Sequence, residues 1–180
     1  EGIVSSGTSF SNVPSFREGA FRGSTFQYMR FYPSIGRIEA GAFDGCKTWS
    51  FKFDADSASS SRYEKGIQII ETGAFRGFLV EHYISISRIY DLRTIQAGAF
   101  DGLVTKFFYL KSNTNLATIE AGAFWNATIE NTVQLSSLPS LNLLPRGVFD
   151  GASMDRISIA WTNITEIQPQ TFNGASVNYI

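Results

Sequence analysis

The side chains that most often perform catalysis are scarce in this chain. His82 is the only histidine and Cys46 the only cysteine among 180 residues. A Cys–His nucleophilic pair needs the two side chains within hydrogen-bond reach, whereas these two fall at different places in the repeat described below. We therefore expect His82 to face solvent just before a strand and Cys46 to act as a small buried hydrophobe. We expect no enzyme activity.

Metal chemistry has equally little support. Asp54-x-Asp56 resembles the start of a calcium loop, but the fifth position is Ala58, the sixth is Ser59 and the twelfth is Lys65. A calcium loop of that kind needs an oxygen ligand, a glycine and a glutamate at those places. A single cysteine also excludes an internal disulfide and a cysteine-rich zinc site. We expect neither a metal nor a cofactor.

Two sequons, Asn126-Ala-Thr128 and Asn163-Ile-Thr165, would accept N-linked glycans in an extracellular protein. A net charge of −1 provides no field that attracts nucleic acid. No apolar run approaches the roughly 18 residues of a membrane span. We expect a secreted protein with no nucleic-acid partner and no membrane span.

A block of the form Glu-x-Gly-Ala-Phe-x-Gly recurs along the chain and organises everything else. Its phenylalanines follow one another at intervals of 22 to 32 residues: Phe21, Phe43, Phe75, Phe100, Phe124, Phe149 and Phe172. A fixed period in the low twenties is typical of coils stacked in one dimension. The charged residues around each block recur too regularly to form a site, and we expect them to be solvated turn positions.

Within each coil an apolar-x-apolar triplet predicts a short strand with both apolar side chains on one side. The triplets begin at Met29, Phe51, Ile84, Phe108, Val133 and Ile157. Apolar residues at steps of three then favour an irregular or 3₁₀-like return path. The glycine-rich block predicts a bend in which phenylalanine fills the interior.

These coils resemble leucine-rich repeats of the extracellular kind. The best match is Phe108-x-Leu110-x-x-Asn113-x-x-Leu116-x-x-Ile119-x-x-Gly122-Ala-Phe124, and Leu144-Pro-Arg-Gly-Val-Phe149-Asp-Gly151 is similar to coils of lymphocyte-receptor and Toll-type ectodomains. The resemblance implies a β-rich solenoid, a right-handed coil with a parallel sheet on its concave face, and a binding function. The chain departs from the pattern because the usual ladder asparagine occurs only at Asn113 and cysteine-rich caps are absent. Its Phe-rich style is similar to secreted arthropod arrays such as the non-catalytic chain of a shrimp luciferase.

We expect one solenoid of six to seven coils over residues 1–180. The longest interval, between Phe43 and Phe75, predicts an inserted polar loop at about 54–66. Residues 1–12 are atypical and are predicted to form an N-terminal cap.

The residues between and beside the apolar triplet positions form the candidate binding surface. Tyr and Arg dominate its first half, and these residue types are favoured at interaction hot spots. The predicted contacts are Tyr28, Arg30, Tyr32, Lys52, Tyr83, Phe107, Tyr109 and Lys111, and the same alternation turns Ser50 and Asp54 outward. A protein partner or another subunit is the favoured ligand.

Three alternatives remain open at this stage. Tyr83, Phe107 and Tyr109 would also form a platform for a small apolar ligand such as a pigment or lipid. The aromatic residues could instead pack against one another across neighbouring strands. The last coil stops at Ile180 where its strand should begin, so the chain could also be a structural protein that self-assembles through this edge.

Overall fold

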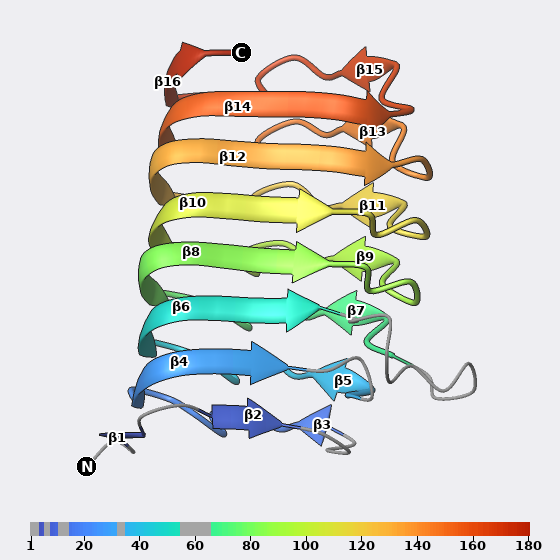
Figure 1. Cartoon of the computed structure of the whole chain (residues 1–180). Helices are drawn as coiled ribbons and strands as arrows, with labels where there is room; N and C mark the ends of the chain where they lie inside the picture. Colours follow the sequence, from blue (N-terminus) through green and yellow to red (C-terminus); the bar gives the residue numbers. More distant parts are fainter. Residues whose placement is uncertain (1–3, 6–7, 11–14, 32–34, 55–65) are drawn as a thin grey trace.

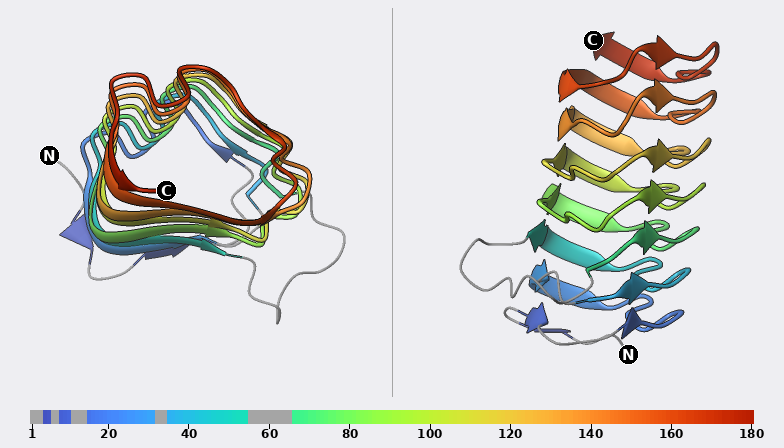
Figure 2. Two further views of the ribbon diagram at one scale, coloured as in Figure 1. Left: turned by 90° about the horizontal axis from the view of Figure 1, so that it is seen from above. Right: turned by 90° about the vertical axis from the view of Figure 1, so that its right-hand side faces the viewer.

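The chain winds as a right-handed coil whose turns stack along one axis, with β-strands on two of its sides (Figure 1). This computed structural model describes residues 4–5, 8–10, 15–31, 35–54 and 66–180. Seen along the axis, successive turns superpose on one closed outline (Figure 2). The predicted solenoid with stacked parallel strands is confirmed.

One side of the coil is a nine-stranded sheet in the order β1-β4-β6-β8-β10-β12-β14-β16, with β2 also paired to β4. Every pairing in it is parallel. Its strands are β1 (Val4–Ser5), β2 (Thr8–Phe10), β4 (Thr25–Phe31), β6 (Lys47–Asp54), β8 (Leu79–Ser87), β10 (Val104–Lys111), β12 (Thr128–Leu138), β14 (Ser153–Thr162) and β16 (Ser176–Tyr179). We call this the long sheet.

The return path, predicted to be irregular or 3₁₀-like, contains a second set of parallel pairings between short strands. Each coil contributes a two-residue strand whose second side chain points inward in all but the last coil. The strands are β3 (Ser15–Phe16), β5 (Arg37–Ile38), β7 (Ile69–Ile70), β9 (Thr94–Ile95), β11 (Thr118–Ile119), and the separate pair β13 (Leu143–Leu144) and β15 (Glu166–Ile167). Backbone pairing between coils therefore continues on this side.

The predicted triplets hold the coils in register. Met29 pairs with Phe51, which pairs in turn with Ile84, and the same row continues through Phe108, Val133 and Ile157. All of these side chains are buried. Because the apolar positions repeat in every coil, stacking covers the apolar edge that one coil alone would expose.

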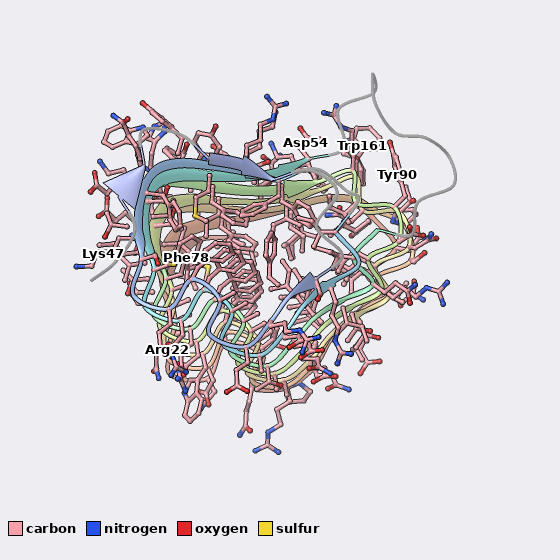
Figure 3. All side chains as sticks on the ribbon, turned by 90° about the horizontal axis from the view of Figure 1, so that it is seen from below. Arg22, Lys47, Asp54, Phe78, Tyr90 and Trp161 are labelled. Carbon is pink, nitrogen blue, oxygen red and sulfur yellow. The ribbon has the colours of Figure 1, made fainter. Side chains whose placement is uncertain are left out.

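The block phenylalanines form a continuous column of stacked rings through the interior. The centroids of Phe43 and Phe75 are 5.0 Å apart and those of Phe75 and Phe100 are 5.2 Å apart. The column runs from Phe21 to Phe172, with all neighbouring centroids 5.0 to 5.3 Å apart. Side chains fill the interior in Figure 3, where Phe78 lies inside the coil and Lys47 outside it.

Around each phenylalanine the backbone bends twice through the left-handed region, which explains the paired glycines. In one block φ is +64° at both Gly41 and Gly45. Asn126 adopts the second of these bends, at φ +51°, and Gln170 adopts the first, at φ +64°. These two blocks therefore keep the bend without the glycine.

The charged residues of the blocks were predicted to be solvated turn positions, but several of them connect neighbouring coils. The Glu71 carboxylate accepts a hydrogen bond from the backbone N–H of Ala40, and Glu120 does the same for Ala97, at 3.0 and 2.9 Å. Asp44 contacts Arg22 in the preceding coil and Arg76 in the following one. The hydrogen bond from Arg76 holds the pKa of Asp44 below its usual value.

Cys46 is fully buried, as predicted for a small hydrophobe. Its Sγ donates a hydrogen bond to the Phe21 carbonyl oxygen at 2.7 Å. Burial disfavours the thiolate and raises the pKa of the thiol to about 12. A thiol held in its neutral form is a poor nucleophile.

Two predicted segments fall mostly on undescribed residues. The inserted loop predicted at about 54–66 coincides with residues 55–65, which lie outside the described ranges. Of the cap predicted at residues 1–12, only β1 and β2 are described, and both pair with β4.

Candidate binding face

The outer side of the long sheet carries two rows of side chains that run across the coils. In the first row Tyr28 is followed in register by Ser50, Tyr83, Phe107, Thr132 and Arg156. In the second row Arg30 is followed by Lys52, Ser85, Tyr109, Gln134 and Ser158. We call these two rows and their flanking side chains the binding face.

Three of the predicted contact residues gather at the middle of this face. The ring centroids of Tyr83 and Tyr109 lie 6.4 Å apart, and those of Phe107 and Tyr109 lie 5.9 Å apart. All three side chains are half-buried. Burial raises the pKa of the Tyr109 phenol. The Lys111 ammonium lies 4.2 Å from the centre of the same ring, within the range of a cation–π contact.

Trp49 and His82 extend this cluster, although alternation around the triplets predicts neither of them as a face residue. Their rings stack at 5.7 Å with 19° between the planes, and His82 also lies edge-on to Tyr83 and Phe107. His82 faces solvent as expected, but it lies within β8 rather than before a strand. Trp49 is 45% exposed although strict alternation from Phe51 would turn it inward. We call Trp49, His82, Tyr83, Phe107 and Tyr109 the aromatic cluster.

Basic side chains border the cluster at the far ends of the strands. Arg30 and Lys52 are adjacent in register and both are half-buried. The Lys52 ammonium lies 3.0 Å from the Asp54 carboxylate, and Arg88 donates two hydrogen bonds to that carboxylate at 2.8 Å. Arg88 was not among the predicted contacts because it follows the triplet and belongs to the turn.

Ser50 and Asp54, which are predicted to point outward, are both covered by larger neighbouring side chains. Asp54 retains 4% of its surface and Ser50 retains 7%. Ser50 lies between Tyr28 and Tyr83 in register, and those larger side chains flank it. Asp54 is held by Lys52 and Arg88, so it neutralises part of the basic border rather than contacting solvent.

Of the other predicted contacts, Tyr28 is exposed on β4 and Tyr32 lies outside the described residues. The later coils present Thr132, Gln134 and Ser158, which gives the small, polar second half that the sequence indicates. Arg156 lies over the ring of Tyr179, its register partner on β16, at 5.3 Å.

A hollow of about 290 Å³ opens beside the aromatic cluster, near the beginning of the long strands. Its lining comes from four adjacent coils and consists of Trp49, Leu79, Val80, Glu81, Val104, Thr105, Lys106 and Glu130. The repeat pattern does not predict this hollow, because its shape depends on how neighbouring strands differ in length.

The two sequon asparagines are both exposed. Asn126 lies in the bend that precedes β12, and its side chain lies beside Gly151 of the next coil. The Asn163 side-chain amide donates a hydrogen bond to the Pro139 carbonyl oxygen at 2.7 Å. Asn115 makes the equivalent bond to Tyr90, so this position forms a polar ladder between coils.

Within the described ranges no cluster of three or more His, Cys, Asp or Glu side chains is arranged to hold a metal ion. In that same part of the chain, no helix has the length and apolar character that a membrane crossing requires.

Comparison with known families decides what this scaffold is. The family model for the BspA type leucine rich repeat region matches the chain in 6 copies, over residues 4–63 and 50–178. The chain belongs to the BspA-type leucine-rich repeat family. Repeats of this kind generally mediate protein–protein interaction, and the family is typically non-enzymatic. No curated protein and no solved structure matches the chain, so the likeness to secreted arthropod arrays receives no support.

Proposed function

We propose that this BspA-type repeat protein binds another protein through the aromatic cluster and the basic residues that border it. One observation carries the proposal: five ring-bearing side chains from three adjacent coils contact one another on the outer side of the sheet. Large rigid side chains offer contact area at a low entropic cost, and Tyr and Trp are enriched at hot spots for this reason.

The basic border supports a partner whose contact surface carries acidic groups at its rim. Lys52 and Arg88 share the Asp54 carboxylate, and the Lys111 ammonium lies over the Tyr109 ring. The whole chain nevertheless has a net charge of −1, so this positive region is local. Complementary charges of this kind raise the association rate and exclude wrong partners.

Three baits would test this function. The unmodified protein, the Tyr83→Ala/Tyr109→Ala variant and the Thr132→Ala/Gln134→Ala variant are used to enrich proteins from the source fluid. The affinity of each enriched protein is then measured by biolayer interferometry. The second double variant is the matched control, because its residues occupy the same two rows on β12.

We expect the tyrosine variant to lose at least about 100-fold in affinity, because two hot-spot side chains contribute about 2 kcal/mol or more each. The control should stay within about threefold, with unchanged circular dichroism in both variants. Equal affinity of the tyrosine variant and the unmodified protein would contradict the proposal. Visible absorbance or bound lipid in the purified protein would instead favour a carrier, and self-association that persists in the tyrosine variant would favour a structural protein.

We also propose an extracellular location, supported by the exposure of both sequon asparagines. Mass spectrometry of the protein from its source, before and after treatment with peptide N-glycosidase, reports whether Asn126 and Asn163 carry glycans. Unmodified asparagine at both positions would remove this support.

A further inference from the structure

The hollow beside the aromatic cluster exists because alternate strands differ by one residue. Between Val80 and Tyr83, β8 has one residue more than β10 has between the paired positions Thr105 and Phe107. The next strand, β12, again has one more, between Ile129 and Thr132. Extra residues of this kind are β-bulges, which redirect side chains and are frequent beside functional sites. Here Lys106 of β10 lies between two strands, β8 and β12, that each carry one extra residue at this level.

Trp49 forms one wall of this hollow and is held in place. Its indole stacks on His82, whose imidazole lies against Tyr83 and Phe107. The Trp49 side chain remains 45% exposed and is part of the hollow lining. A large ring that is already fixed loses little conformational entropy when a ligand stacks on it. Leu79 and Val104 add apolar surface to the same lining.

The charged side chains of the hollow alternate in sign from coil to coil. Glu81, Lys106 and Glu130 lie at the same level of β8, β10 and β12. Within the described part of the chain, none of the three takes part in a hydrogen bond or an ion pair. They therefore present two strong acceptors and one strong donor to whatever enters.

We propose that this hollow is a binding site for a neutral sugar ring. A pyranose has an apolar C–H face that suits an indole wall and hydroxyl groups that donate to carboxylates and accept from an ammonium group. The two carboxylates disfavour an anionic ligand, and a neutral ligand rich in hydroxyl groups can satisfy the carboxylates and the Lys106 ammonium group at the same time. The volume of about 290 Å³ is at the lower limit for small-molecule sites, which fits one or two rings.

This site is separate from the proposed protein contact, because its lining shares only Trp49 with the aromatic cluster. A variant that abolishes one activity therefore need not affect the other. Lys111 and Tyr28 belong to the binding face alone, and their replacement should leave sugar binding unchanged.

The three tryptophans of the chain allow a direct test. Trp125 and Trp161 are 51% and 86% exposed, so the Trp125→Phe/Trp161→Phe variant leaves Trp49 as the only indole at small structural cost. Emission of this variant is followed while glucose, galactose, mannose and N-acetylglucosamine, and then their β-linked tetramers, are added. We expect a saturable change with at least one of these sugars. Amide shifts in the ¹⁵N-labelled protein should be largest at residues 79–82, 104–106 and 130.

Two substitutions locate the site. Glu130→Ala should weaken sugar binding by about tenfold or more, because it removes an acceptor of a charge-assisted hydrogen bond. Glu166→Ala makes the same change at an exposed position of β15 and should have no effect. Trp49→Ala, followed by amide shifts because the reporter is lost, should weaken binding by about tenfold.

Three results would overturn the proposal: no saturable change with any sugar, amide shifts centred elsewhere, or equal affinity in Glu130→Ala. N-acetylarginine amide serves as the competing probe. If it saturates the emission change and the sugars do not, the hollow receives a basic side chain of a protein partner instead.

Discussion

The rings of Phe43 and Phe75 stack with centroids 5.0 Å apart and only 4° between their planes, although 32 residues separate them in sequence. Phe75 and Phe100 are 25 residues apart, and their rings stack at 5.2 Å and 7°. The additional residues of the longer coil therefore leave the column of phenylalanines unchanged. Loop length costs little free energy when the residues at both ends of the loop remain in place.

Replacing a phenylalanine of the column should lower the free energy of unfolding more in the middle of the column than at its end. Phe100 is fully buried in the middle of the column, whereas Phe172 is only partly buried at its last position. Phe100→Ala should lower the free energy of unfolding by about 3–5 kcal/mol, and Phe172→Ala by less than half of that. Urea denaturation followed by circular dichroism measures both values. Equal losses at the two positions would mean that the column does not depend on neighbours on both sides.

Asn113 should be far more sensitive to substitution than its exposed neighbour Asn115. Its side-chain oxygen accepts from the Ile89 N–H at 2.9 Å and its amide donates to the Ile86 carbonyl at 3.0 Å, with no exposed surface. Asn113→Leu leaves two buried backbone groups unsatisfied, which should cost about 2–5 kcal/mol. Asn115→Ala removes one exposed bond to Tyr90 and should cost about 1 kcal/mol. Similar denaturation midpoints for the two variants would contradict this ranking.

Cys46 should make the protein less stable at alkaline pH. The unfolded thiol ionises near its ordinary pKa of 9.0, whereas the folded thiol ionises at about 12. Between these values the unfolded state binds fewer protons than the folded state, so the free energy of unfolding falls as pH rises. The slope from this group is at most about 1.4 kcal/mol per pH unit.

Denaturation of the unmodified protein and of Cys46→Ala at about pH 8 and about pH 11 isolates this contribution. Tyr109, whose pKa is also raised, adds a slope of the same sign to both proteins. We expect a shallower pH dependence in Cys46→Ala, whatever its absolute stability. The same change in the free energy of unfolding between the two pH values in both proteins would show that the folded thiol ionises normally.

Replacing Asn126 by glycine should give a more stable protein than replacing it by alanine. Its backbone adopts φ +51° in a bend where the other coils have glycine at φ +60° to +66°. Asn126→Gly should therefore be neutral or stabilising by up to about 1 kcal/mol, and Asn126→Ala should be destabilising by about 1 kcal/mol. Thermal denaturation of protein produced without glycosylation tests this order. A more stable alanine variant would contradict the assigned backbone conformation.

The coil architecture could be predicted from the sequence because each element of it repeats. The triplet at Ile84 and the phenylalanine at Phe75 have counterparts in every coil, so their inward direction is indicated several times over. The buried position of Cys46 follows from the same alignment, in which Leu103 occupies its place.

The binding face could be predicted only in part, because it depends on relations between coils. Tyr83, Phe107 and Tyr109 follow from alternation around their triplets. Trp49 does not, because the alternation of β6 is interrupted between Thr48 and Ser50, opposite the extra residue of β8. The burial of Asp54 requires Arg88, which lies in the next coil and in a turn of its own. Such cross-coil pairs carry no signal within a single repeat.

The interchangeability of the coils has a consequence for how proteins of this design change in length. Each bend closes with the same backbone hydrogen bonds to the next coil, such as Phe43 N–H to Ala74 and Phe75 N–H to Ala99, both at 2.8 Å. A duplicated coil could therefore form these same backbone hydrogen bonds with the coils on both of its sides. Duplication would extend the outer sheet by one strand spacing, about 4.8 Å, and place a fresh set of variable side chains there. New specificity can arise in this way by copying a segment, without repacking the interior.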